Sequence, residues 1–304
     1  MTTPTASLLL QAAAAAAGSQ QYPAGALYVV ATPIGNLADL TLRAIHVLSL
    51  VDAVACEDTR HTSPLMRHLG LDKPLFAVHQ HNEQASSGDV IARLARGERV
   101  AYVSDAGTPA ISDPGAALVA SVVASGRLVV AVPGASSAVT AVSVAGDTVG
   151  AGFRFIGFLP AKGNERALAL KALAAANDTQ VLFEAPHRIE SLAQGLADTC
   201  GLRIVTVCRE LTKQFETVVT QPASMLPGWL AGDPNRLRGE FVLVVHAAAP
   251  TESTDEAARH DVVLLTLLAE LPLKQAVSLA AALTDAPRNA LYARALTLKN
   301  ESTD

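Results

Sequence analysis

The sequence has few charged, aromatic and cysteine residues. Of its 304 residues, 17% are charged and 4% are aromatic, whereas 50% are hydrophobic; an average soluble domain has about 25% charged residues. A chain this apolar can bury a sizeable core, which excludes intrinsic disorder over most of its length. The net charge of -5 provides no global positive field to attract a nucleic acid. Taken alone, this composition favours an enzyme that acts on small molecules.

The lack of paired cysteines and of long apolar segments indicates where in the cell the protein is expected. Cys56, Cys200 and Cys208 are widely separated and form no CxxC pair, so we expect no disulfide framework and a cytoplasmic location. The longest uncharged stretches, 1–38 and 128–146, are interrupted by proline or glycine. Neither is typical of the roughly 20 apolar residues that span a membrane, so no membrane association is expected. No basic residue opens the chain as in a signal peptide.

Several common site motifs are missing as well. The sequence contains no GxGxxG fingerprint, no GxxxxGK[ST] phosphate loop and no GxSxG nucleophile elbow. These absences exclude a standard dinucleotide site and phosphoryl transfer on a P-loop. His79-Gln80-His81 offers two possible metal ligands, but no third ligand stands at an instructive spacing, so we expect no metal site.

What is present is an alternation of strand-length apolar runs with amphipathic segments of helix length. In the first half, strands are expected at 27–31, 53–56, 75–78, 100–103 and 128–132. Near-continuous apolar strands separated by helices indicate a parallel sheet covered on both faces. Later strands follow one another more closely, which indicates a mixed second sheet; they are expected at 153–158, 180–183, 204–209, 216–220 and 239–246.

The fold class is therefore α/β, with two α/β domains and a small C-terminal helical domain. The N-terminal sheet is expected to be mainly parallel and the second sheet mixed. We expect a disordered or loosely helical tail at 1–24, domains at 25–149 and 150–249, and a linker with helices at 250–304. No internal repeat is evident.

Three loops at the ends of expected strands are rich in small and turn-forming residues. They are 32–37, 104–115 and 133–138. In the second loop, the Asp105 carboxylate could accept a hydrogen bond from a ligand's hydroxyl or amine. In the third, small residues precede a helix whose first N–H groups are free for a ligand. Since the carboxyl ends of parallel strands meet at one edge, these loops predict a pocket there. Plain tight connections remain the alternative for each loop taken singly.

Charged side chains follow three other strands. The segments 57–60, 184–188 and 209–216 carry glutamate or aspartate together with arginine. Each is consistent with substrate contact, and equally with a helix-capping cluster or a solvated face.

Taken together and in this order, the segments resemble one known family. They are similar to the ribosomal RNA cytidine 2′-O-methyltransferases of the tetrapyrrole methylase superfamily. The resemblance runs from about Leu27 to Lys299 and includes the helical tail, leaving only residues 1–24 outside it. The segments that carry it are 30–37, 57–60, 104–115, 132–137, 184–188, 209–215, 271–277 and 288–292.

The resemblance implies a tetrapyrrole-methylase-like enzyme, usually a homodimer, that binds S-adenosylmethionine in a cleft between its two domains. Its acceptor would be small-subunit ribosomal RNA or the small ribosomal subunit. The first loop departs from the glycine-rich GxGxGD type, which separates the RNA branch from the porphyrinogen branch. The residues that the resemblance implies for the cofactor are Pro33, Gly35, Asp105, Gly107, Thr108, Ser136, Ser137 and Phe183.

Methylation of a ribose hydroxyl requires that its proton can leave, so a positioned base or cation is expected. Possible bases are Glu57, Asp58, Glu184 and His187, and possible cations are Arg60, Arg188 and Lys213. Our hypothesis places Glu184 and Arg188 at the reaction centre because they follow a strand of the second domain. Asp58 and Arg60 are the further catalytic candidates.

The C-terminal helices carry the basic residues Lys274, Arg288, Arg294 and Lys299. They predict a contribution to RNA-backbone affinity with a shallow salt dependence; simple packing or dimer support is the alternative. For the whole chain, two other functions remain open: C-methylation of a porphyrinogen, and a non-catalytic module for RNA binding or ribosome assembly.

Overall fold

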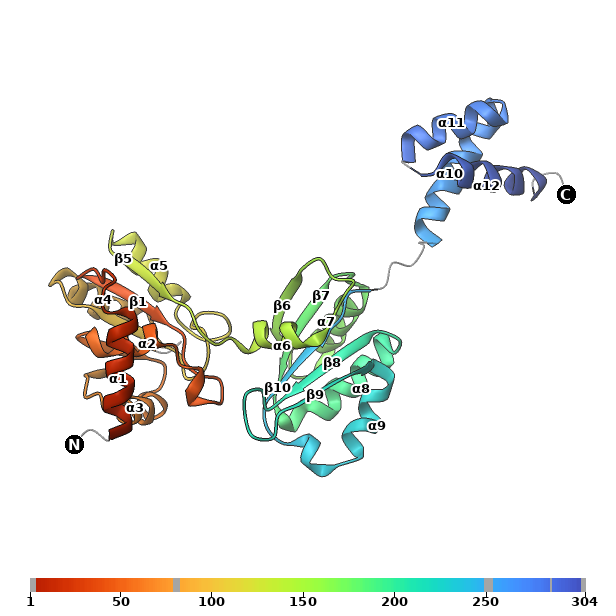
Figure 1. Cartoon of the computed structure of the whole chain (residues 1–304). Helices are drawn as coiled ribbons and strands as arrows, with labels where there is room; N and C mark the ends of the chain where they lie inside the picture. The colour runs from red at the N-terminus through yellow and green to blue at the C-terminus, as the bar shows by residue number, and fades with distance from the viewer. Residues whose placement is uncertain (1–3, 79–82, 249–253, 285, 302–304) are drawn as a thin grey trace. The chain divides into compact units, whose positions relative to one another are not determined.

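The computed structural model describes residues 4–78, 83–248, 254–284 and 286–301, so His79-Gln80-His81 lies outside it. The chain forms two compact units, Met1–Ala247 and Ala248–Asp304. The first unit contains two five-stranded sheets with their covering helices, and the described part of the second is helical (Figure 1). The predicted α/β fold class is confirmed.

All strands of the first sheet are parallel, in the order β3-β2-β4-β1-β5. Every residue of β2 and β4 is buried, which explains why both read as unbroken apolar runs. The bounds are β1 Ala26–Val30, β2 Ala53–Cys56, β3 Leu75–Ala77, β4 Val100–Val103 and β5 Leu128–Val132.

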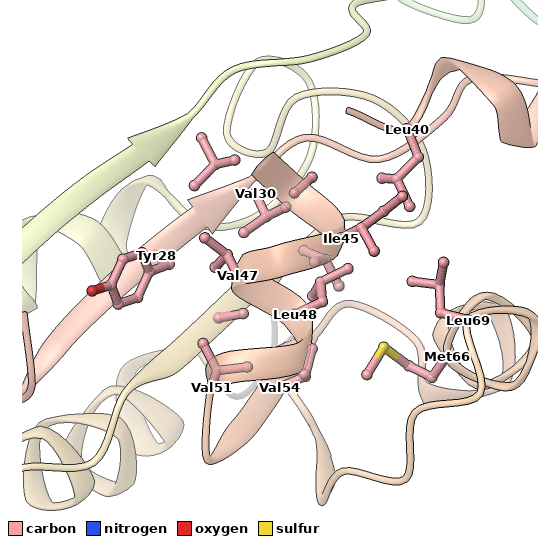
Figure 2. Packing of buried hydrophobic residues seen from close by; sticks show 14 of the residues in the cluster. Tyr28, Val30, Leu40, Ile45, Val47, Leu48, Val51, Val54, Met66 and Leu69 are labelled. Atoms are coloured by element: carbon pink, nitrogen blue, oxygen red, sulfur yellow. The ribbon is translucent and has the colours of Figure 1, made fainter. Parts of the chain in front are cut away.

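Helices cover both faces of this sheet, because successive strand residues point to opposite sides. Tyr28 and Val30 pack with Val47 and Leu48 of α2 on one face (Figure 2). Leu27 points to the other face and packs in the cluster formed by α4 and α5. The bounds are α2 Leu42–Leu50, α3 Thr59–His68, α4 Glu83–Ala95 and α5 Ala116–Ala124.

The N-terminal segment is helical, the second of the two alternatives for this tail, and not disordered. Residues 4–17 form helix α1 (Pro4–Ala17). Ala6, Ala13 and Ala17 are at most 2% exposed, and Ala13 lies in the same core cluster as α2. Alanine favours the helix, and its small side chain lets α1 approach α2 closely. The segment is therefore part of the first layer of helices.

The second sheet is mixed, as predicted, in the order β6-β7-β10-β8-β9. Strands β6 and β7 are parallel, whereas β10 pairs antiparallel with β7 and β8, and β9 pairs antiparallel with β8. The bounds are β6 Phe153–Phe158, β7 Thr179–Glu184, β8 Ile204–Arg209, β9 Thr217–Pro222 and β10 Phe241–Val245.

Three helices pack on one face of the second sheet and α6 packs on the other. Ala138, Ala141 and Ala145 of α6 are buried in one cluster with Val181 and Val244 of the sheet. Residues 137–145 thus belong to the second layer, although the sequence analysis assigned them to the first domain. The bounds are α6 Ser137–Ala145, α7 Gly163–Ala175, α8 Ile189–Cys200 and α9 Leu226–Ala231. Short 3₁₀ turns complete the unit at η1 Leu37–Asp39, η2 Pro186–Arg188, η3 Ala223–Met225 and η4 Pro234–Leu237.

The carboxylate of Asp147 ties the end of α6 to the second sheet. It accepts hydrogen bonds from Thr179 Oγ1 at 2.6 Å and from the backbone N–H of Ala247 at 2.7 Å. It also accepts from the N–H groups of Val149 at 3.0 Å and Gly150 at 3.1 Å. One side chain therefore joins α6, the start of β7 and the segment after β10.

The C-terminal unit consists of α10 (Thr254–Glu270), α11 (Leu273–Thr284) and α12 (Arg288–Glu301) around a small apolar core. Arg294 is bound to Asp261, with Nη2 at 2.6 Å from Oδ2. Among the described residues, no helix combines the length and apolar character needed to cross a membrane.

Candidate functional site

A cavity of about 400 Å³, here called the main cavity, lies where the loops of the first sheet meet the second sheet. Its volume falls in the range of small-molecule sites. The side chains from the first sheet and α6 are Ile34, Ala106, Gly107, Thr108, Ile111, Ser112, Asp113, Ser136 and Ser137; those from the second sheet are Phe158, Phe183, Glu184, Ala185, Pro186, Glu240, Phe241 and Val242.

The loops of the first sheet are bound to one another at the cavity wall. Thr32 and Gly107 exchange two backbone hydrogen bonds of 2.9 and 3.0 Å, and Thr108 Oγ1 donates to the Ala135 carbonyl at 2.9 Å. Gly107 has φ +82°, and a Cβ there would lie 3.2 Å from Ile34 Cγ2. Glycine is therefore favoured by the backbone conformation, and its lack of a side chain leaves room for the close approach of the loops.

The N-terminus of α6 opens into the main cavity. Ser136 is the N-cap residue, yet its side chain makes no capping hydrogen bond, and both Ser136 and Ser137 line the cavity. The first N–H groups of a helix carry partial positive charge and need acceptors. This end of the cavity is thus suited to an anionic or hydroxyl-bearing group.

The second sheet provides an aromatic wall. The rings of Phe158 and Phe183 pack edge to face, with centroids 5.7 Å apart and planes at 71°. Phe241 and Val242 from β10 add apolar surface beside them. The main cavity therefore has an apolar side next to its hydroxyl-rich side, the combination that a nucleoside needs.

Glu184 lines the main cavity, but its carboxylate is held in the protein interior. Its side chain is 0% exposed and lies between Arg188 Nε at 3.0 Å and Arg166 Nη1 at 3.6 Å. Both guanidinium groups also donate to the carbonyl of Pro160 or Leu159. The carboxylate and both guanidinium groups are thus engaged within the protein, so the arrangement suits a structural clamp. Arg188 does not line the main cavity.

A smaller cavity of about 210 Å³, here called the side cavity, is lined by residues of the same two loops that line the main cavity. In the first loop, Thr32 and Pro33 line the side cavity and Ile34 lines the main cavity. In the loop after β4, Asp105 lines the side cavity and Ala106 lines the main cavity. Its lining residues are Thr32, Pro33, Leu37, His61, Thr62, Pro64, Leu65, Ser104 and Asp105.

Asp105 organises the start of α3 beside the side cavity. One of its carboxylate oxygens lies 2.6 Å from His61 Nδ1, and the other accepts from the Asp58 N–H at 3.1 Å. Asp58 caps α3 and is paired with Arg60, whose Nη2 lies 2.6 Å from Oδ2. Hydrogen bonds from Arg60 hold the pKa of Asp58 at about 2, so Asp58 is a very weak base at neutral pH.

Three carboxylates gather at this edge of the first sheet. Burial raises the pKa of Glu57, and the charges of Asp113 and Asp105 raise it further. Burial also raises the pKa of Asp113. In the described part of the chain, no group of three or more His, Cys, Asp or Glu residues is arranged to hold a metal ion.

The predicted site residues fall into separate groups. Gly107, Thr108, Ser136, Ser137, Phe183 and Glu184 line the main cavity, whereas Pro33 and Asp105 line the side cavity. Gly35 lines neither; a Cβ there would lie 2.6 Å from Lys213 Cγ, so Gly35 allows the first loop to touch the loop after β8. Asp58 and Arg60 flank the side cavity.

Phe158, Ile111 and His61 line the two cavities but are not among the site residues predicted from the sequence. Phe158 is the last residue of β6, and its position at a strand end was the available signal. His61 follows Arg60 by one residue, but nothing in the sequence shows that it meets Asp105.

Two five-stranded α/β layers that enclose a cleft define a class of methyltransferase fold. The family model for tetrapyrrole (corrin/porphyrin) methylases matches residues 26–227. Among solved structures, a uroporphyrin-III C-methyltransferase from Thermus thermophilus matches 73% of this chain and 94% of its own, at 23% identity and a TM-score of 0.52. The cobalt precorrin-4 methyltransferase CbiF gives a TM-score of 0.53 at 18% identity, covering 74% and 98% of the two chains. At these identities the likeness shows the fold alone.

Curated relatives give the particular family. Ribosomal RNA small subunit methyltransferase I of Escherichia coli O157:H7 is 46% identical over 90% of this chain and 95% of its own. The protein of the same name from Pseudomonas aeruginosa is 47% identical over 92% and 99% of the two chains. A model described as the RsmI C-terminal HTH domain matches residues 254–299. The chain belongs to this methyltransferase family, as the motifs of the sequence indicated.

Proposed function

We propose that the protein transfers a methyl group from S-adenosylmethionine to the 2′-hydroxyl of a cytidine in small-subunit ribosomal RNA. One observation carries the proposal: the main cavity joins the free N-terminus of α6 and three linked loops to an aromatic wall. The names of the relatives support ribosomal RNA as acceptor. The resemblance of the sequence motifs supports the ribose hydroxyl as the methylated group.

The residues of the main cavity fit the chemical groups of S-adenosylmethionine. The Phe183 ring suits a flat adenine. The Ser136 and Ser137 hydroxyls and the first N–H groups of α6 suit a carboxylate or a ribose diol. When bound, the cofactor supplies a methyl group activated by a positively charged sulfur. We assign cofactor binding to Gly107, Thr108, Ser136, Ser137 and Phe183.

The other predicted site residues receive different roles. We propose that Arg60, whose side chain is 86% exposed, contacts an RNA phosphate and that Asp58 holds it in place. Glu184 and Arg188 fix the 184–186 wall of the main cavity, because their charged groups are used within the protein. Pro33, Gly35 and Asp105 shape the loops between the two cavities.

We also propose a homodimer that works in the cytoplasm on the small ribosomal subunit. Val139 and Val144 of α6 are 58% and 46% exposed, and a contact between two subunits would cover these apolar side chains. Lys274 and Arg288 of the C-terminal unit are the cations proposed for RNA. Sedimentation analysis tests the dimer: a monomer at micromolar concentration contradicts it.

The cofactor assignment is tested by calorimetry with S-adenosylmethionine. We expect Phe183→Ala to weaken binding at least tenfold, about 1.4 kcal/mol. Phe215→Ala is the matched control, since Phe215 is 70% exposed and lies outside the main cavity. Wild-type protein that binds no S-adenosylmethionine would overturn the assignment.

The acceptor is tested by mass mapping of ribose methylation in small-subunit RNA after incubation with the protein. A methylated cytidine ribose is the expected product. A parallel incubation with a porphyrinogen tests the rival acceptor. Methylation of the porphyrinogen but not of the RNA would show that the acceptor is wrong.

A further inference from the structure

The proposed methyl transfer requires a base, and neither Glu184 nor Asp58, the two carboxylates among the predicted catalytic residues, suits that role. The Glu184 carboxylate lies between two arginines and its side chain is 0% exposed. Asp58 is paired with Arg60 and has a pKa of about 2. Glu184 therefore offers a ribose hydroxyl no exposed carboxylate oxygen, and Asp58 is too weakly basic to take its proton at neutral pH.

The side cavity contains a pair of groups with the required chemistry. His61 Nδ1 lies 2.6 Å from Asp105 Oδ2, and both residues line the side cavity. A carboxylate can only accept a hydrogen bond, so Nδ1 carries the proton and Nε2 keeps its lone pair. The same carboxylate accepts from the Asp58 N–H at 3.1 Å, which fixes its orientation.

The position of this pair suits the acceptor side of the reaction. The same two loops line both cavities at neighbouring residues: Pro33 and Asp105 face the side cavity, and the next residue of each loop faces the main cavity, which we assign to the cofactor. The His61 side chain is 64% exposed. Arg60, the preceding residue, also has an exposed side chain. A ribose that enters the side cavity from solvent would thus meet an imidazole and a cation.

We infer that the side cavity holds the acceptor ribose and that His61, positioned by Asp105, is the general base of the methyl transfer. The inference rests on the proposed function. The 2′-oxygen forms a bond to the methyl carbon, and the carbon–sulfur bond of the donor breaks. The hydroxyl proton passes to His61 Nε2, so the products are a 2′-O-methyl ribose, a neutral thioether and an imidazolium.

The charges around His61 set the direction of its pH dependence. Its hydrogen bond with Asp105 raises the pKa of His61 above the ordinary value, and the Asp58 carboxylate acts in the same direction while Arg60 opposes it. Glu57, at the end of β2, is the other charged group coupled to His61. Because the base must be neutral, the rate should rise with pH through the pKa of His61 and then level off.

The test is single-turnover methylation of small ribosomal subunits between pH 5.5 and 9, with subunits and S-adenosylmethionine saturating. His61→Ala and His61→Gln should lower the plateau rate about 100-fold or more. The rise of the rate with pH below the plateau, the acidic limb of the profile, should disappear in both variants. Gln can still donate to Asp105, so it preserves the loop while removing the basic nitrogen. His68→Ala, an exposed position on the same helix, is the control and should keep the wild-type profile.

Asp105→Asn tests the positioning residue separately. It should lower the plateau rate and move the limb to lower pH, because the charge that raises the pKa of His61 is removed. A second readout, NMR titration of the histidine imidazoles, needs neither RNA nor donor. The His61 resonance is assigned as the one missing in His61→Ala, and it should titrate at lower pH in Asp105→Asn. Calorimetry with S-adenosylmethionine checks that each variant is folded.

The outcomes separate this inference from the proposed function. An inactive wild-type protein would overturn the proposed function itself. An active wild type together with a His61→Ala rate within threefold of it, or an acidic limb that persists in His61→Ala, would overturn only the assignment of His61.

Discussion

Replacement of Asp147 by asparagine should destabilise the first unit by about 2 kcal/mol at pH 7. Burial raises the pKa of Asp147, but the hydrogen bonds from Thr179, Ala247, Val149 and Gly150 outweigh it and hold the pKa at about 2, against 3.8 for a free side chain. One pKa unit corresponds to about 1.4 kcal/mol, so this difference is worth about 2.4 kcal/mol. The asparagine keeps one acceptor oxygen and turns an N–H donor toward partners that themselves donate.

Urea unfolding followed by tryptophan fluorescence is the assay. The sequence has one tryptophan, Trp229, which packs against the core of the second sheet, so its signal reports on the layer that Asp147 joins. The stabilisation by the ionised carboxylate is fully present above the unfolded pKa and is lost as the pH falls through the folded pKa. The difference between wild type and Asp147→Asn should therefore be constant from pH 7 to 5 and shrink from about pH 4 downward.

A control and two refuting results complete this test. Asp89→Asn, at an exposed position on α4, should change stability by no more than about 0.5 kcal/mol. The reasoning fails if Asp147→Asn matches wild type at pH 7 within that margin. It also fails if the difference between the two proteins grows as the pH falls.

Three further predictions concern other parts of the chain. Ala13→Glu should lower the free energy of unfolding by about 2 kcal/mol or more, because it places a charge in a fully buried position of α1; Leu8→Glu, at a position 66% exposed on the same helix, should be neutral in thermal unfolding. Arg166→Met should cost about 3–5 kcal/mol in urea unfolding, because it leaves the buried Glu184 carboxylate with one cation in place of two; an unchanged midpoint would contradict the clamp. Removal of residues 248–304 should leave S-adenosylmethionine affinity within twofold in calorimetry and reduce RNA affinity in filter binding, and equal RNA affinity would remove the role proposed for the C-terminal helices.

The strands of the first sheet could be predicted from the sequence because burial on both faces leaves a strong local signal. β2 and β4 have the predicted bounds, since each is a fully apolar run with polar residues at its ends. The position of α6 could not be predicted in this way. Almost every residue of α6 is small or apolar, so the sequence has no polar face to show which sheet the helix covers. Alanine-rich α1 has the same property.

The site could be predicted only as far as the strand ends define it. The sequence places Asp105 and Ser136 at one sheet edge, which is where the structure has them. Consecutive residues of a loop point to different sides, however, so Asp105 lines the side cavity while Gly107 and Thr108 line the main one. Arg166, which contacts Glu184, and Asp105, which contacts His61, are distant from them in sequence, and such contacts leave no local pattern.

The scarcity of surface cations limits what phosphate contacts can contribute to the affinity of this acidic chain for RNA. Several arginines donate to main-chain carbonyls within the protein: Arg166 to Pro160, Arg188 to Leu159, and Arg203 to His246 and Ala176. Arg294 of the C-terminal unit is paired with Asp261. Fewer cations therefore face solvent than the composition suggests. Each phosphate contact adds less than about one to the slope of log binding constant against log salt concentration. With so few contacts, affinity must come from the fit of a structured target to the cavities, and unfolded RNA of the same sequence should bind poorly.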